Sequence, residues 1–181
     1  MSTEDVIFRW LRLNDWKEFK NLQNISCDDK ECGFTPYTDK IVNKLFNPFT
    51  KDEYKTQFES NFPENKDALK IIAATVKGKV IATGLLWIEK KTEVATADHK
   101  VCIIGHILQV KVDPSYLNVN TMLARIIHTL EGLAWINGCT DTMISHGNFP
   151  ETIITQLKYC FISRNGNSYY FKSRYNNAFL M

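Results

Sequence analysis

The feature that most constrains the fold is a long strand candidate followed by an amphipathic helix. Residues 101–112 favour a β-strand throughout, and apolar side chains at helical spacing begin at residue 122. The apolar positions of this helix are Met122, Leu123, Ile126, Ile127, Leu130, Leu133 and Ala134. Asn137 and Gly138 are typical of a helix C-terminus, so we expect the helix to end there.

Further strand and helix signals flank this pair. Residues 6–13 alternate as a strand, residues 14–25 form a capped helix, and β-rich runs at 69–76 and 80–89 are joined by a hairpin signal at 77–79. The other expected elements are a loop at 27–34, helices opening at Thr35 and Thr50, a strand at 142–145, a helix at 150–159, and strands at 161–164 and 168–174. This order predicts an α/β (α+β) arrangement around one central sheet, in a single domain spanning residues 1–181.

Charge and hydropathy exclude several classes of partner. The 22 basic and 20 acidic residues give a net charge of +2 without a basic run, so nothing favours nucleic acid or a membrane surface. No apolar stretch reaches the roughly 18 residues of a membrane span, and the polar start argues against a secretory signal. Five cysteines, three in apolar segments, indicate reduced, buried thiols in a cytoplasmic protein. Cys27 and Cys32 have no second pair at zinc spacing, so we expect no metal.

Short motifs around the long strand occur in a distinctive order. A hairpin strand from Val80 to Lys91 precedes Gly105-His106-Ile107, and Val110-Lys111-Val112 and Asp113-Pro114-Ser115-Tyr116 follow it. In order and spacing, over about residues 6–172, these segments resemble the glucosamine-6-phosphate N-acetyltransferases of the GNAT superfamily. The form is divergent, like that of apicomplexan parasites, and has extra residues at 47–67. The resemblance implies the GNAT acyl-CoA N-acyltransferase fold, with a central mixed, mostly antiparallel sheet flanked by helices.

The resemblance also implies an activity. Enzymes of this family move the acetyl group from acetyl-CoA to the amine of glucosamine 6-phosphate by direct attack, a step of UDP-N-acetylglucosamine synthesis. They need no metal and act as homodimers. The aromatic tail at residues 169–171 is compatible with a C-terminal strand exchanged in such a dimer, and equally with an ordinary edge strand.

The family's cofactor contacts lie along the long strand and in the loop after it. The strand backbone pairs with the pantetheine amides of acetyl-CoA, and glycines in the loop let backbone N–H groups face the pyrophosphate. The corresponding residues are Val110, Lys111, Val112, Leu117, Asn118, Val119, Asn120, Thr121 and Met122. The chain departs from the family because no glycine lies between His106 and Glu131.

Asparagine stands at both positions where the family has glycine in this loop. Asn118 and Asn120 belong to a residue type that readily takes positive φ. We therefore expect them to keep the loop's shape, with Asn120 or Thr121 capping the helix. The alternative is a plain capped surface turn that has lost its ligand.

The reaction centre departs from the family as well. Two acidic residues follow the Gly-His-Ile segment in the family, for substrate binding and amine handling. Here Leu108 and Gln109 occupy these substrate-contacting and catalytic positions, and neither accepts a proton at neutral pH. His106 is expected to be structural, hydrogen-bonded within the sheet.

Other candidates for the chemistry lie further along the chain. Gln156 takes the place of a tyrosine that hydrogen-bonds the CoA thiolate in the family, so it is expected at the cofactor. Tyr159, three residues later and on nearly the same helix face, is the candidate to replace that tyrosine. Ser145 stands at a second acidic position that contacts substrate. His146 follows it and has the pKa of a proton acceptor near neutral pH.

The acceptor's phosphate calls for hydroxyl groups and cations. Ser26, at the end of the first helix, matches a hydroxyl residue that contacts substrate in the family. Lys172 falls near a basic position that reaches the phosphate across the dimer interface, and Arg164 and Arg174 are fallback candidates.

Two other functions remain open. One is a catalytically inactive GNAT-like module that binds CoA or a protein partner, which Leu108, Gln109 and Gln156 favour. The other is an acetyltransferase with a different amine acceptor, because the acidic pair of the family is missing.

Overall fold

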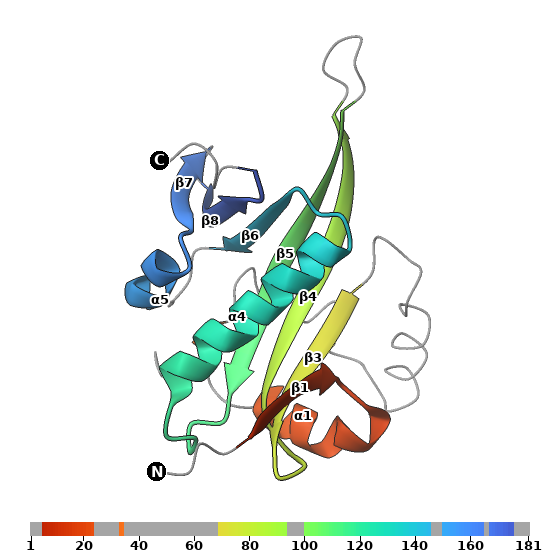
Figure 1. Ribbon diagram of the computed structural model, residues 1–181, viewed down its shortest axis with the longest axis vertical. Helices are drawn as coiled ribbons and strands as arrows, with labels where there is room; N and C mark the ends of the chain where they lie inside the picture. Colours follow the sequence, from red (N-terminus) through yellow and green to blue (C-terminus); the bar gives the residue numbers. More distant parts are fainter. Residues whose placement is uncertain are drawn as a thin grey trace.

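The computed structural model describes residues 5–23, 33–34, 69–93, 100–145, 150–164 and 167–175. Within them, eight strands form one sheet in the order β1-β3-β4-β5-β6-β8-β7, with β2 paired to β5 off this path (Figure 1). The strands are β1 (Val6–Trp10), β2 (Gly33–Phe34), β3 (Leu69–Val76), β4 (Lys79–Glu93), β5 (Lys100–Val112), β6 (Asp141–Ser145), β7 (Cys160–Arg164) and β8 (Asn167–Ser173). The helices are a 3-10 turn, η1 (Leu13–Asp15), followed by α1 (Trp16–Gln23), α4 (Val119–Ile136) and α5 (Glu151–Gln156). Among these strands only β5 and β6 pair in parallel, so the expected mixed, mostly antiparallel sheet is confirmed.

The hairpin between β3 and β4 forms where the sequence predicts it. Its two central residues, Lys77 and Gly78, have φ angles of 51° and 81°. Positive φ at both central positions is typical of a type I′ turn, whose twist matches that of the flanking strands. The turn therefore fixes the register in which Val76 lies opposite Lys79.

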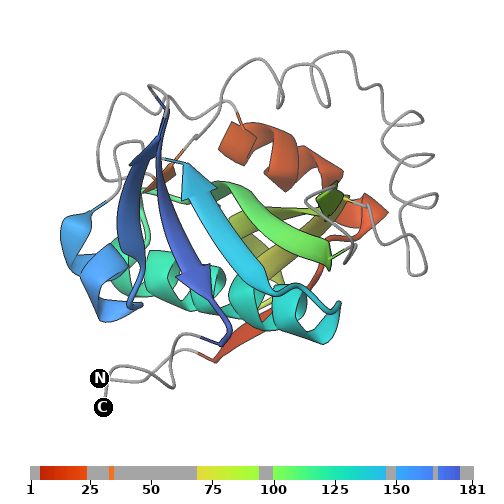
Figure 2. The same ribbon diagram turned by 90° about the horizontal axis from the view of Figure 1, so that it is seen from above.

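Two helices cover opposite faces of the sheet, α1 on one and α4 on the other (Figure 2). The apolar stripe of α4 is buried as predicted, and two glycines let the helix approach the strands closely. A Cβ at Gly84 would lie 2.5 Å from Ile126 Cγ2, and one at Gly105 would lie 2.8 Å from Ala134 Cβ. On the other face Phe19 of α1 is 1% exposed and packs in a second, smaller core.

The start of α1 is held by a partly buried ion pair. Arg9 donates two hydrogen bonds to Asp15, at 2.6 and 2.8 Å, and the Arg12 backbone N–H donates to the same carboxylate. The hydrogen bonds from Arg9 outweigh burial and hold the pKa of Asp15 below its usual value. The expected first helix thus begins as a 3-10 turn, and α1 follows from Trp16.

Several elements differ from expectation. Gly33 and Phe34, expected in a loop, form β2. The expected helix at 150–159 ends at Gln156, because Lys158 adopts a φ of 60° and turns the chain out of the helix. Of the cysteines predicted to be buried, Cys139 is buried, but Cys160 is exposed on β7. Burial raises the pKa of the Cys139 thiol to about 11.

The helices expected from Thr35 and Thr50 lie outside the described residues, as do Cys27 and Cys32. Among the described helices, none is long and apolar enough to cross a membrane.

Candidate functional site

The candidate site lies where β5 continues beyond its parallel neighbour. β4 pairs with β5 along the whole of one edge, whereas β6 pairs with the other edge only from Ile104 to Ile107. In Figure 1, β5 runs on toward the start of α4 while β6 turns toward α5. We call residues 100–107 of β5 the closed half and residues 108–112 the open half. β6 leaves the open half available to other partners, and β2 pairs there.

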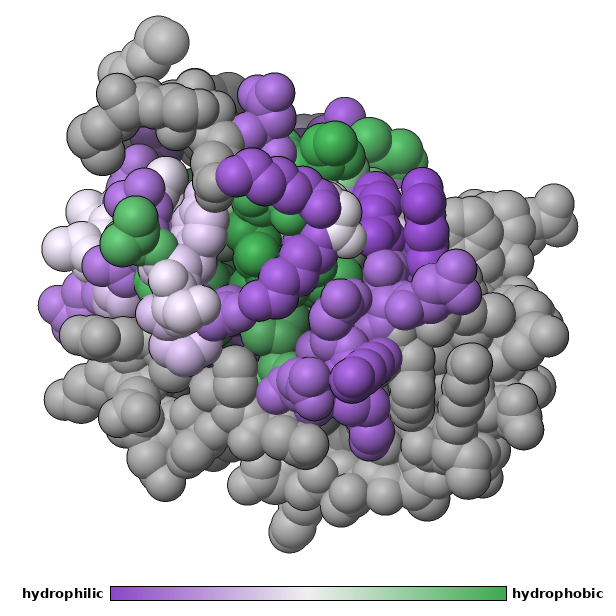
Figure 3. Space-filling view, turned by 90° about the horizontal axis from the view of Figure 1, so that it is seen from below, coloured by the Kyte–Doolittle hydropathy of each residue, from purple (hydrophilic) through white to green (hydrophobic). Residues whose placement is uncertain are grey.

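A β-bulge marks the boundary between the two halves. Leu85 lies opposite Gln109 and Leu86 opposite Ile107, so Leu108 is an extra residue in β5. A bulge bends its strand and strengthens the local twist, which helps to separate β5 from β6 beyond this point. Figure 3 looks onto this end of the sheet and shows hydrophobic residues in green beside hydrophilic ones in purple.

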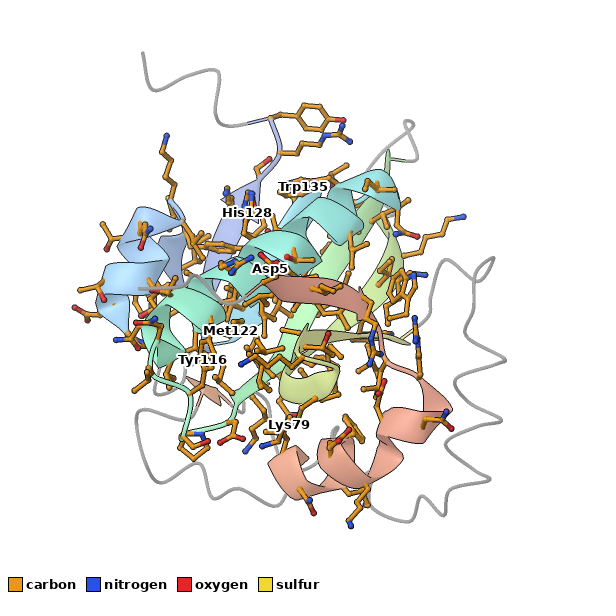
Figure 4. All side chains as sticks on the ribbon, turned by 60° about the horizontal axis from the view of Figure 1, so that its bottom comes forward. Asp5, Lys79, Tyr116, Met122, His128 and Trp135 are labelled. Atoms are coloured by element: carbon orange, nitrogen blue, oxygen red, sulfur yellow. The ribbon has the colours of Figure 1, made fainter. Side chains whose placement is uncertain are left out.

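The N-terminus of α4 lies at the end of the open half. Ser115 donates two hydrogen bonds to Asp113, from its backbone N–H at 2.9 Å and from its hydroxyl at 2.6 Å, in the turn after β5. The helix begins at Val119, and Figure 4 shows Tyr116 and Met122 near its start and His128 and Trp135 further along. Burial alone would raise the pKa of Asp113, but the bonds from Ser115 and the charge of Lys79 bring it below its usual value.

The loop conformation corrects two expectations. Asn118 is the N-cap residue, with φ at −123° and no side-chain capping bond, so the helix starts before Asn120 and Thr121. Among the described non-glycine residues only Lys77 and Lys158 have positive φ, so neither asparagine acts as a glycine substitute. Asparagine is merely permissive of positive φ, and an ordinary turn suffices to enter this helix.

The backbone N–H groups of the first helical turn point away from the helix body at this end. Those of Val119, Asn120 and Thr121 lie in that turn, whereas the Met122 N–H donates to the Asn118 carbonyl at 3.0 Å. The Met122 side chain is 1% exposed and belongs to the core. Leu117, 94% exposed, stands at the surface beside this turn.

Two buried polar atoms without a protein partner lie on the α1 face of the open half. Leu108 and Leu85 belong to the α1-side core, and Gln109 lies opposite Leu85, so it points to the same face. Gln109 is 2% exposed, and its Oε1 makes no hydrogen bond. The hydroxyl of Thr83, which is fully buried opposite Lys111 on the same face, also makes none. A buried unsatisfied atom costs about 1–3 kcal/mol, which a polar group of a ligand would offset.

The α4 face of the closed half is instead filled by protein contacts. The Tyr159 hydroxyl lies 3.0 Å from Thr142 Oγ1, and Lys172 Nζ donates to Glu131 at 2.5 Å. Thr142 lies opposite Gly105, on the closed side of the point where β5 and β6 separate. Burial raises the pKa of Tyr159 well above its usual value, and the charge of Glu131 raises it further. This hydroxyl is therefore buried and bonded within the closed half, and its role at a leaving thiolate stays a prediction.

The remaining candidates are placed as follows. Gln156 is the exposed last residue of α5, and Tyr159 is not on its helix face because the helix has ended. The Lys172 ammonium is committed to a buried carboxylate, so it holds the fold together rather than facing outward. The side chains of Val110 and Val112 are buried in the α4-side core, so only their backbone faces the open edge.

Four further residues were singled out in the sequence. Ser145 ends β6 and pairs with Tyr169, while Ser26 and His146 lie outside the described residues. His106 agrees with its expected structural role, because its Nε2 lies 2.8 Å from Glu89 Oε2 and its ring stacks on Trp87. Sequence reasoning missed Thr83, whose only signal is a hydroxyl residue within the apolar run of residues 80–88.

Comparisons with known proteins identify the fold. No protein-family model matches the sequence, and no curated protein matches it significantly. Among solved structures, the chain is similar to PaiA N-acetyltransferase from Thermoplasma acidophilum in complex with coenzyme A, with a TM-score of 0.61, 9% identity, and 93% of this chain and 99% of that chain covered. It is also similar to a GNAT-family acetyltransferase from Streptococcus pneumoniae, with a TM-score of 0.59, 13% identity, and 92% of this chain and 97% of that chain covered. For glucosamine-6-phosphate N-acetyltransferase from Arabidopsis thaliana the TM-score is 0.51 and the identity 22%, with 80% of this chain and 84% of that chain covered. The fold is therefore that of the GNAT acetyltransferases.

Proposed function

We propose that this chain is an acetyl-CoA-dependent N-acetyltransferase and that its acceptor is the amine of glucosamine 6-phosphate. One observation carries the acetyltransferase proposal: β6 leaves the open half of β5 just before β5 leads into the N-terminus of α4. The open edge of a strand is thus followed directly by the backbone N–H groups at the start of a helix. An extended, amide-containing arm that ends in phosphates needs both in that order.

The residues at this end fit coenzyme A by the chemistry of their donors and acceptors. The backbone of residues 108–112 offers N–H and C=O groups on the edge away from β4, as for an added strand. The N–H groups of Val119, Asn120 and Thr121 offer donors to a pyrophosphate, and the helix dipole favours negative charge there. Acetyl-CoA supplies an activated acyl group, so the acceptor amine is the nucleophile and no acyl-enzyme is required.

The acceptor amine is assigned to the α1 face beside the bulge. Gln109 Oε1 accepts a hydrogen bond from the amine, and the Thr83 hydroxyl binds a neighbouring polar group of the acceptor. Neither side chain removes a proton, so their contribution is to hold the amine in line with the acyl carbon. His146, which follows the last residue of β6 in sequence, is our candidate for the proton acceptor.

The choice of glucosamine 6-phosphate rests on the motif order of the chain and on the named activity of its Arabidopsis neighbour. One observation favours a second candidate, an acetyltransferase for an amine without a phosphate. Lys172, the basic residue expected at the phosphate, is paired with Glu131. An inactive CoA-binding module is the third reading, favoured by Leu108 and Gln109 at the two acidic positions.

The test is release of free CoA thiol from acetyl-CoA by the purified protein, with glucosamine 6-phosphate, with glucosamine, and with no acceptor. Release that requires the phosphorylated sugar supports the proposal. Equal release with both sugars supports the second candidate. Binding of acetyl-CoA in calorimetry without release from any mixture contradicts glucosamine 6-phosphate as the acceptor, and leaves an inactive CoA-binding module or a transferase with another amine acceptor.

A further inference from the structure

The open edge of β5 is already paired with another strand. β2, Gly33–Phe34, pairs antiparallel with Lys111 and Val110. The same two residues of β5 pair with β4. A strand has one hydrogen-bonding edge on each side, so β2 must lie on the edge facing away from β4. It therefore lies on the edge that β6 occupies in the closed half.

This is also the edge that the pantetheine arm needs. A ligand that binds as an added strand uses the same backbone N–H and C=O groups that β2 uses, so the two cannot bind Val110 and Lys111 together. We infer that Gly33–Phe34 is an autoinhibitory strand, here called the β2 strap, which must leave β5 before the pantetheine arm binds. The inference rests on the proposed function, from which it takes the identity of the ligand.

The length of the β2 strap makes it suited to displacement. It has two residues, whereas strands in globular proteins commonly have about five or six. One of the two is glycine, which loses more conformational freedom on pairing than any other residue. A pairing this short is readily replaced by a ligand that also gains contacts to the helix N-terminus. The apparent dissociation constant of the ligand is then the intrinsic value divided by the fraction of molecules in which the strap has left β5.

The experiment removes the ability of the strap to pair while keeping its length. In the double variant Gly33→Pro/Phe34→Pro, both backbone N–H groups are lost and strand pairing is disrupted. The matched control Gly33→Ala/Phe34→Ala makes similar changes in side chains but keeps both N–H groups. Calorimetry measures the binding of acetyl-CoA, and of adenosine 3′,5′-bisphosphate, which lacks the pantetheine arm, to the wild type and both variants.

We expect the proline variant to bind acetyl-CoA about threefold to tenfold more tightly than the alanine control, the change expected when about one net backbone hydrogen bond no longer competes. Adenosine 3′,5′-bisphosphate should bind all three proteins equally, and equal melting temperatures would confirm that the variants fold. Equal acetyl-CoA affinities, or weaker binding by the proline variant, would overturn the strap while leaving the proposed function intact. Failure of the wild type and both variants to bind acetyl-CoA would overturn the proposed function and the strap with it.

Discussion

The surroundings of the two halves of β5 differ in whether buried polar groups have hydrogen-bond partners. In the closed half, Thr142 bonds Tyr159, Glu131 bonds Lys172, and His106 bonds Glu89. In the open half, Gln109 Oε1 and Thr83 Oγ1 are buried but have no partner. One exception in the closed half, Glu131 Oε2, belongs to a carboxylate whose charge Lys172 already balances.

This difference separates polar residues that stabilise the fold from those that we assign to the acceptor. A satisfied buried network contributes specificity and rigidity, whereas an unsatisfied atom persists at a cost in stability. The same kind of substitution should therefore reduce stability in one half and activity in the other.

The largest expected effect is in the closed half. Lys172→Met leaves the Glu131 carboxylate buried without a countercharge, because the two side chains are 13% and 5% exposed. We expect a loss of about 3–5 kcal/mol in the free energy of unfolding, measured by urea denaturation. The double variant Lys172→Met/Glu131→Leu should recover most of this loss. A single variant as stable as the wild type would show that the pair is not a structural contact.

The next effect is in the open half and concerns activity. Gln109→Leu removes the Oε1 that has no partner without changing the size of the side chain greatly. We expect kcat/KM for the acceptor to fall by roughly 100-fold, or about 2.7 kcal/mol of transition-state stabilisation. The free energy of unfolding should stay equal or rise by about 1 kcal/mol. Unchanged kinetics would contradict the assignment of this amide to the acceptor.

A matched pair of threonine substitutions compares the halves most directly. Thr142→Val removes the buried hydrogen bond between Thr142 and the Tyr159 hydroxyl, so we expect a loss of about 1–3 kcal/mol in stability and little change in activity. Thr83→Val removes a hydroxyl that bonds no protein group, so we expect unchanged stability and a several-fold loss in activity. Urea denaturation and the thiol-release assay on both variants measure the contrast. The same response from both would remove the distinction between the halves.

The smallest effect lies outside both halves, at the ion pair that holds α1. The pKa of Asp15 is lowered in the folded protein, so its contribution is present above the unfolded pKa of about 3.9 and is lost as pH falls through the folded value. We expect this contribution to be about 1 kcal/mol. Thermal denaturation of the wild type and of Asp15→Asn should differ at pH 7 and converge toward pH 2. A constant difference across this range would contradict the ion pair.

The fold was largely predictable because its main elements carry local, periodic signals. The stripe of α4, the Lys77–Gly78 turn and the long run of β5 are each visible within one segment of the sequence. The β2 pairing was not predictable in this way, because two residues are too few to show a period. Their partners, Lys111 and Val110, also lie far along the chain.

The order of motifs along the chain predicts a site on the open half and the loop before α4, and this location stays a prediction. Several contacts of the predicted site residues could not be foreseen. The contacts of Lys172 and Tyr159 were missed, since Glu131 lies 41 residues before Lys172 and the turn at Lys158 has no sequence signal that separates it from a continuing helix. Pairings between distant segments are decided by packing of the whole sheet, which local patterns do not record.

The parallel pairing of β5 with β6 also bears on the order of folding. The hairpins β3–β4 and β7–β8 join neighbouring segments and need little loop closure, whereas β6 reaches β5 only after the 18 residues of α4 have crossed the sheet. Contacts of higher sequence separation form more slowly. The pairing of β6 with β5 is therefore expected to form late in refolding, so that strand signal in circular dichroism returns before the proposed binding of acetyl-CoA.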